Sequence, residues 1–251
     1  MALFHSLDDL CSKVLFFDIE TAPAFPSFDA MPPALQDQWC HQAEKINRYE
    51  DTGMSAEELY PLKAGIYAEF ARVVCVSFGL FGKKEGHYFF RLKSYCGEDE
   101  ARLLQEFARI LDNKSIRYLC AHNGREFDVP FLARRYLIQG LPVPAMIDLR
   151  MKRPWDEAAR YVIDTMELWS FGDKKSFTRL ELLCAVFDIP SPKSDIDGSK
   201  VGEVFWKEKD LERIARYCEN DVLATARLYL KYMRLPSISS EQVEYADRLM
   251  V

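Results

Sequence analysis

The stretch VLFFDIETAP (14–23) begins with four apolar residues and then places two carboxylates, Asp18 and Glu20, on either side of an isoleucine. Side chains alternate along a β-strand, so these carboxylates point the same way, about 7 Å apart along the backbone. Two negative charges at that spacing destabilise each other unless a cation or a proton lies between them. The stretch therefore predicts a buried strand that carries two acids out of the core. Taken alone, it also fits a strand end that surfaces into water.

The composition is that of an ordinary globular protein. Its 251 residues are 49% hydrophobic and 29% charged, enough for a full core in one large domain. The net charge of −6 argues against coating of duplex nucleic acid, but it allows an enzyme that meets a few phosphates through metal ions. No apolar run approaches the roughly 20 residues of a membrane span, and the first residues lack a basic leader with a long apolar segment. We therefore expect a cytoplasmic protein without a membrane partner.

The cysteines and histidines show no metal-binding spacing. No two cysteines form a C-x-x-C pair, and several lie inside apolar runs. An odd number of scattered cysteines predicts reduced, mostly packed thiols and argues against a zinc site. The seven cysteines are Cys11, Cys40, Cys75, Cys96, Cys120, Cys184 and Cys218.

The order of the expected elements is typical of an α/β protein. After the first strand, a proline-rich loop leads into a helical pattern that we interpret as an insertion at about 26–70, where Ser55 and Glu58 form a capping-box signal. A hairpin, an amphipathic helix, a further strand and a further helix follow. These elements are expected at 71–81, 86–95, 98–113, 115–123 and 127–140. Such a succession indicates an α/β fold.

The rest of the chain is mostly helical. A short strand is expected at 160–165, a helix at 177–189 and the longest helix at 209–234. We expect the C-terminal extension at about 235–251 to form a loop and a short helix. With no internal repeat and no low-complexity tract, the sequence predicts a single domain over residues 1–251.

Two further carboxylates stand in positions where an acid needs a reason. Asp128 follows the strand at 115–123, in the first turn of a helix, where an acid also simply complements the helix dipole. Asp221 lies in or beside the apolar stripe of the longest helix, on the same face as Tyr217 four residues earlier. A carboxylate there is costly unless it is paired, bound to metal or at a solvated boundary.

These three patterns, in this order, resemble the DEDDy group of 3'-5' exonucleases, which have the ribonuclease H-like fold. The matching stretches are FFDIET, AHNGREFD and YCENDVLAT, within a resemblance that spans roughly residues 12–233. The sequence is most similar to the proofreading exonuclease domain of family B DNA polymerases, and among those to stand-alone bacterial versions. The resemblance implies an α/β fold with a mixed central sheet of about five strands flanked by helices. The residues that match the group's motifs are Asp18, Glu20, Asp128, Tyr217 and Asp221.

Oxygen ligands without sulfur or imidazole suit Mg²⁺ or Mn²⁺. Two such ions about 4 Å apart can activate a water and steady the leaving oxygen of a phosphodiester. The resemblance implies that Asp18 bridges both ions, that Glu20 and Asp221 hold the ion with the attacking water, and that Asp128 serves the second ion. It also implies that Tyr217 orients the water. A free tyrosine has a pKa of about 10, which argues against a phenolate base at pH 7.

A second group of residues is expected on the substrate side. Thr21, His122, Asn123 and Phe127 follow or flank the motif acids, and we expect them to line a pocket for the terminal nucleotide. Polar His122 and Asn123 emerge at a strand end, where α/β folds build sites, although both can also stabilise that strand end. For Phe127, a place in the core is the better expectation.

The function expected from the resemblance is removal of 5'-mononucleotides from nucleic-acid 3' ends, with two divalent cations as cofactors. DNA, single-stranded or frayed, is the favoured partner. Two alternatives remain: an RNA 3'-end-processing exonuclease of the same group, and a non-catalytic module that binds nucleic acid or protein. The four acids favour the enzyme, because a binding module gains nothing from converging carboxylates.

Overall fold

A mixed β-sheet forms the centre of the protein. The computed structural model describes residues 4–152, 161–173, 177–190 and 195–251. Within them the strand order is β5-β4-β1-β2-β3-β6, with β7 also paired to β3. β1 pairs parallel to β4 and antiparallel to β2, which makes the sheet mixed as expected. The strands are β1 Val14–Pro23, β2 Ala71–Lys84, β3 His87–Cys96, β4 Tyr118–Ala121, β5 Val162–Asp164, β6 Val243–Tyr245 and β7 Leu249–Met250.

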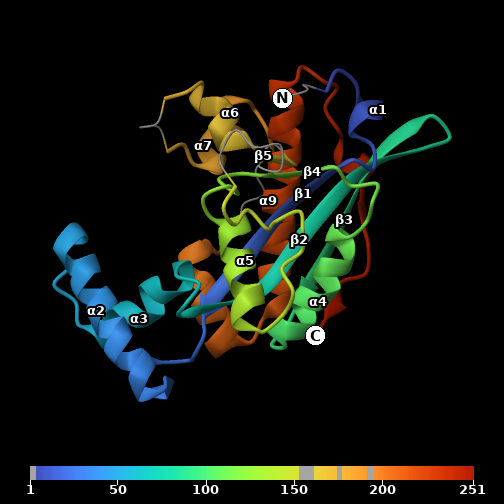
Figure 1. Ribbon diagram of the computed structural model, residues 1–251. Helices are drawn as coiled ribbons and strands as arrows, with labels where there is room; N and C mark the ends of the chain where they lie inside the picture. Colours follow the sequence, from blue (N-terminus) through green and yellow to red (C-terminus); the bar gives the residue numbers. More distant parts are fainter. Residues whose placement is uncertain (1–3, 153–160, 174–176, 191–194) are drawn as a thin grey trace.

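Helices cover both faces of this sheet. Figure 1 shows α4 (Glu100–Leu111) and α5 (Asp128–Ile138) on one side and α9 (Leu211–Tyr232) on the other. The helices expected from periodicity at 98–113, 127–140 and 209–234 are therefore confirmed, each a few residues shorter. The remaining helical segments are α1 Leu7–Leu10, α2 Pro33–Glu50, α3 Ala56–Lys63, α6 Thr165–Ser170, α7 Leu180–Val186, α8 Val201–Glu203, the π-helix Val204–Glu208 and the 3₁₀ turns Phe28–Ala30, Ala64–Ile66, Gly198–Lys200 and Ser240–Gln242.

The alternation in β1 decides which face each of its residues meets. The odd-numbered Leu15, Phe17 and Ile19 join the core cluster that contains residues of α4 and α5. The even-numbered Val14 and Phe16 join the cluster formed with α9. Each of these buried side chains contributes on the order of 1.5–3 kcal/mol by leaving water. Continued alternation places the two acids of β1, which are also even-numbered, on the α9 face.

A pair of helices follows β1 and has a hydrophobic cluster of its own. α2 and α3 lie to one side of the sheet in Figure 1. Trp39 and Tyr60 meet edge to face at 5.3 Å, and both are fully buried. The capping box expected from Ser55 and Glu58 is present at the start of α3.

The C-terminal segment corrects one expectation. The segment has one 3₁₀ turn at Ser240–Gln242 and then ends in β6 and β7, so the short helix expected at the terminus is replaced by two strands. Both strands pair in parallel with β3, whose outer N–H and C=O groups would otherwise form an open sheet edge. Within the described ranges the sheet therefore has seven strands, against the five or so expected. Among the described residues, every helix is too short or too polar to traverse a lipid bilayer.

Candidate active site

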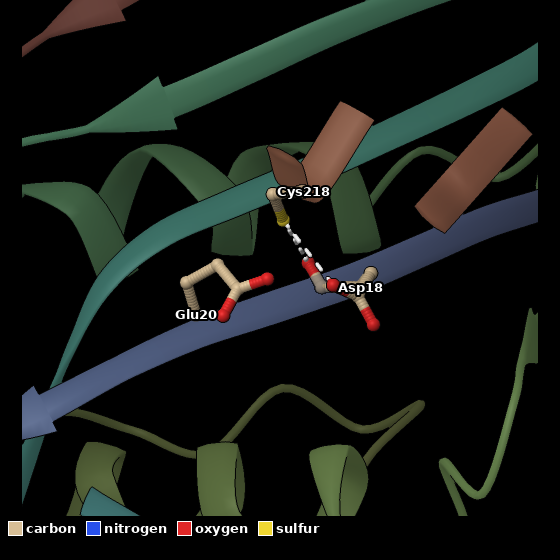
Figure 2. A group of neighbouring side chains, drawn as sticks. All are labelled: Asp18, Glu20 and Cys218. Atoms are coloured by element: carbon tan, nitrogen blue, oxygen red, sulfur yellow. Dashed lines mark hydrogen bonds between the residues drawn. The ribbon is translucent and has the colours of Figure 1, made fainter. Parts of the chain in front are cut away.

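β1 delivers the first two acids. Asp18 and Glu20 rise from this strand on the side of α9, and Cys218 faces them from that helix (Figure 2). A carboxylate oxygen of Asp18, one of Glu20 and the sulfur of Cys218 all lie within 4.8 Å of one another. The Cys218 thiol donates to the backbone carbonyl and to Oδ2 of Asp18, each at 3.4 Å. The strand therefore presents both acids towards α9.

The third acid reaches the same strand from the opposite layer. Asp128 is the first residue of α5, is buried, and accepts a hydrogen bond through Oδ1 from the backbone N–H of Ile19 at 3.2 Å. Ile19 stands between the two acids of β1, so this bond ties Asp128 to their backbone. The turn before it is tight: a Cβ on Gly124 would lie 2.5 Å from the Ala121 side chain. A side chain at position 124 would therefore push the start of α5 away from β4.

α9 contributes the remaining two motif residues. Tyr217 and Asp221 lie one turn apart on this helix. Burial, together with the charge of Glu181, raises the pKa of Asp221 to about 7, although the interaction with Tyr217 opposes this rise. Burial also raises the pKa of Tyr217, and the charges of Glu20 and Asp221 raise it further.

The acids lie close enough to disturb one another. Burial raises the pKa of Asp18 well above its usual value, and the charges of Asp128 and Asp221 add to this rise. Burial likewise raises the pKa of Glu20, followed by the charges of Asp18, Asp221 and Asp128. For Asp128, burial raises the pKa to about 7. Four carboxylates that each resist ionisation form a site that needs either protons or cations.

The residues expected on the substrate side make contacts within the protein. The Thr21 hydroxyl donates to the backbone carbonyl of Gly65 at 2.7 Å, which ties β1 to the segment after α3. Phe127 packs against Phe131 with ring centroids 5.4 Å apart, next to the α4–α5 core. Thr21 and Phe127 therefore both make contacts that stabilise the protein itself.

His122 and Asn123 differ in whether their side chains keep a hydrogen-bonding atom without a partner. Both ring nitrogens of His122 are engaged at 2.9 Å, Nδ1 with the Thr165 hydroxyl and Nε2 with the Thr178 carbonyl, and burial lowers the pKa of this histidine. Asn123 has a left-handed backbone with φ of 63°. Its side-chain Oδ1 is buried and has no hydrogen-bond partner among the described residues. Asn123 therefore keeps an acceptor for a ligand, whereas His122 does not.

Two buried carboxylates outside the motifs support the site. Asp164, at the end of β5, accepts hydrogen bonds from the backbone N–H groups of Asn123 at 2.9 Å and Arg125 at 3.0 Å, and so holds the turn that leads to Asp128. Glu219 of α9 accepts from Ser94 of β3 at 2.7 Å and from Nε of Arg248 at 2.9 Å.

Sequence reasoning missed both of these supports. The only signal for Asp164 is an acid at a strand end followed by a threonine, a helix-capping pattern that the structure bears out. Nothing near Glu219 in the sequence announces its partners, because they lie on β3 and in the C-terminal segment.

Comparisons with known proteins identify a family and a fold for this chain. Residues 66–249 match a family model described as a predicted 3'-5' exonuclease related to the exonuclease domain of PolB. The matched range contains Asp128, Tyr217 and Asp221, while Asp18 and Glu20 precede it. No curated protein matches the sequence.

A solved structure shows the same fold. The family B DNA polymerase from the hyperthermophilic archaeon Pyrobaculum calidifontis matches with a TM-score of 0.56 and 16% sequence identity. The match covers 88% of this chain and 24% of the polymerase chain. The mixed α/β, exonuclease-like fold expected from the resemblance is therefore confirmed.

Proposed function

Because the chain belongs to the family of predicted 3'-5' exonucleases related to the exonuclease domain of PolB, we propose that it hydrolyses phosphodiester bonds at nucleic-acid 3' ends and releases 5'-mononucleotides. One observation carries this proposal. Asp18, Glu20, Asp128 and Asp221 come from three elements, and the charges of Asp128 and Asp221 raise the pKa values of Asp18 and Glu20. Such a concentration of acids destabilises the protein unless protons or cations neutralise it, and we infer that it serves to bind cations.

The donor set fits divalent cations that prefer oxygen. Four carboxylates would hold two ions of Mg²⁺ or Mn²⁺, in keeping with the hard-ligand preference of both metals. When bound, two such ions supply a nucleophilic water at neutral pH and offset charge on the leaving 3' oxygen. The raised pKa values support the same assignment, because a cation would relieve the repulsion that burial and crowding create.

Tyr217 takes the role of positioning the attacking water. Its raised pKa keeps the hydroxyl protonated at neutral pH, so it acts as a hydrogen-bond partner and not as a base. Asp221, one turn further along α9, interacts with this side chain. Water oxygen attacks phosphorus, the bond to the 3' oxygen of the preceding nucleotide breaks, and the released nucleotide keeps its 5' phosphate.

DNA with a single-stranded or frayed end is the substrate that we favour. A terminal nucleotide must unstack from its neighbour to reach a buried site, and the free-energy cost of this is lowest at an unpaired end. Asn123 is our candidate for contact with that nucleotide, because its Oδ1 is free. Thr21, His122 and Phe127 would act on the substrate through the shape of the site. RNA remains the second candidate substrate.

A side-by-side degradation assay tests the function. Oligonucleotides of DNA and RNA, labelled at the 5' end, should shorten stepwise from the 3' end in Mg²⁺ or Mn²⁺ and release nucleoside 5'-monophosphates. Excess EDTA should stop the reaction. Asp128→Asn should abolish it, whereas Asp112→Asn, the same change at an exposed position at the end of α4, should not. Undiminished cleavage in EDTA would contradict the proposal. So would a failure to degrade either DNA or RNA in Mg²⁺ and in Mn²⁺.

A further inference from the structure

Two cysteines face each other across the hairpin formed by β2 and β3. Cys75 and Cys96 are register partners in this antiparallel pair. Their sulfur atoms lie 2.7 Å apart, and both side chains are fully buried. Cys75 is also the register partner of Glu20 on β1, so the pair lies one strand from the acidic site.

The backbone geometry at this position suits a covalent link. The neighbouring pair is hydrogen-bonded, since Gly97 N–H donates to the Val74 carbonyl at 3.0 Å. Pairs alternate along an antiparallel ladder, which makes Cys75 and Cys96 a non-hydrogen-bonded pair with Cα atoms about 4.5 Å apart. This lies within the range of about 4.4–6.8 Å that disulfides span.

A third thiol competes for Cys75 but is held elsewhere. Cys218 interacts with Cys75, but its thiol donates a hydrogen bond to Oδ2 of Asp18 at 3.4 Å. It reaches Cys75 from α9, outside the register of the hairpin. The geometry therefore favours Cys96 as the partner of Cys75.

We propose that Cys75 and Cys96 are an oxidation site, which closes to a cross-strand disulfide when the protein meets a two-electron thiol oxidant such as hydrogen peroxide. Both S–H bonds break and one S–S bond forms. The two protons and two electrons reduce one peroxide to two molecules of water. The sulfurs, 2.7 Å apart, need to approach by only about 0.7 Å to reach bonding distance.

Access to the buried pair comes from the end of the sheet. Cys96 is the last residue of β3, and the element over it is the two-residue β7, which pairs Met250 with Cys96. Such short terminal pairings open at low free-energy cost and admit small molecules. Because burial raises the pKa of Cys75, the closed protein should react slowly.

Peptide mapping tests the linkage directly. The folded protein is treated with hydrogen peroxide, the peroxide is removed, and free thiols are alkylated after unfolding. Trypsin then separates the three cysteines onto peptides 73–83, 94–102 and 217–227. We expect 73–83 joined to 94–102, lighter than the two reduced peptides by two hydrogen atoms, with Cys218 alkylated. A link from 73–83 to 217–227 would overturn the proposal, as would full alkylation of Cys75 and Cys96 after partly exposed Cys40 has been oxidised.

Melting curves give a readout that is independent of mapping. Closing the hairpin restricts the unfolded chain, so oxidation should raise the melting temperature of the wild type by about 5–10 °C. The melting temperature of Cys96→Ser should not rise after treatment with the oxidant. Cys184→Ser removes another buried thiol, on α7, and should respond like the wild type. An equal rise in the Cys96→Ser variant would contradict the disulfide. Because neither experiment measures nucleolysis, both outcomes are independent of the proposed exonuclease activity.

Discussion

The hydroxyl of Tyr217 lies among groups that all favour its protonated form. Burial and the charges of Glu20, Asp221 and Asp18 raise its pKa. A phenol under these conditions can donate and accept hydrogen bonds but has no means to take a proton from water. Under the proposed function, the hydroxyl oxygen of Tyr217 therefore makes the chemical contribution, while the ring contributes packing.

Tyr217→Phe removes that atom alone. We expect the rate of nucleotide release to fall by about 10- to 1000-fold, the effect of losing one positioned polar group. Affinity for Mn²⁺, measured from the metal-induced rise in melting temperature, should change little because Tyr217 is not a proposed ligand. Tyr229→Phe is the matched control: the same change on the same helix, at a buried hydroxyl without a hydrogen-bond partner in the described chain. Wild-type turnover in Tyr217→Phe would remove Tyr217 from the mechanism.

At the scale of elements, α9 is held to the sheet by charge as well as by apolar packing. Glu219 is 3% exposed, and both its oxygens accept hydrogen bonds from Arg248, at 2.9 and 2.8 Å. Ser94 of β3 adds a third bond. The C-terminal segment therefore fixes the helix that carries Tyr217 and Asp221.

Arg248→Ala should leave the buried Glu219 charge without its cation. We expect the free energy of unfolding to fall by about 2–4 kcal/mol, because removal of one partner of a buried ion pair leaves the other as an uncompensated buried charge. Arg91→Ala breaks an exposed pair with Glu244 instead and should cost about 1 kcal/mol or less. Urea unfolding in chelator measures both. The double variant Arg248→Ala/Glu219→Gln should recover part of the loss. Equal losses in the two single variants would show that the Glu219 contact does not hold α9.

The same elements show what the sequence could and could not predict. β1 and α9 were predictable, because each repeats an apolar pattern along a face packed on the core. β6 and β7, with three and two residues, are too short to carry a pattern, and they form because β3 offers an unpaired edge.

The residues of the site also include some that the sequence predicted and others that it did not. Each of the acids Asp18, Glu20, Asp128 and Asp221 alone also fits an ordinary structural role, and the set was assigned because its three motifs, in order, resemble the DEDDy exonucleases. In the structure, the charges of Asp128 and Asp221 raise the pKa values of Asp18 and Glu20. The support from Asp164 was not predictable, since its partners are backbone N–H groups about 40 residues away whose orientation only the folded turn defines.

Across the whole molecule, we expect the converging acids to make stability depend on pH and, under the proposed function, on metal. In the metal-free protein the pKa values of Asp128 and Asp221 are raised to about 7, from about 4 in an unfolded chain. A raised folded-state pKa adds stability that is fully present below the unfolded pKa and is lost as the pH rises through the folded one. The chelated protein should therefore lose stability between about pH 4 and 7.

Melting curves of wild type and Asp18→Asn, each at pH 5 and pH 8, test this in chelator. The wild type should lose more stability than Asp18→Asn between pH 5 and pH 8, because the variant lacks the negative charge of Asp18 at the centre of the cluster. At pH 8 the variant should be as stable or more stable, by about 1 kcal/mol, the size of one pKa unit of repulsion. His122, whose lowered pKa favours folding at higher pH, is common to both proteins and cancels in the comparison. Millimolar Mn²⁺ should raise the melting temperature of the wild type more than that of the variant. A steeper fall in Asp18→Asn would mean that hydrogen bonds or cationic side chains of the protein already stabilise these acids, and it would contradict the predicted repulsion.

The bond between Cys218 and Asp18 joins residues 200 positions apart. A chain leaving the ribosome would present Asp18 and Glu20 long before α9 is made, because synthesis proceeds from the N-terminus. Until then the two acids would lack Tyr217 and Asp221, and the α9 face of β1 would be bare. Under the proposed function, a nascent or truncated chain is harmless to the nucleic acids around it, and degradative activity appears only with the last large helix.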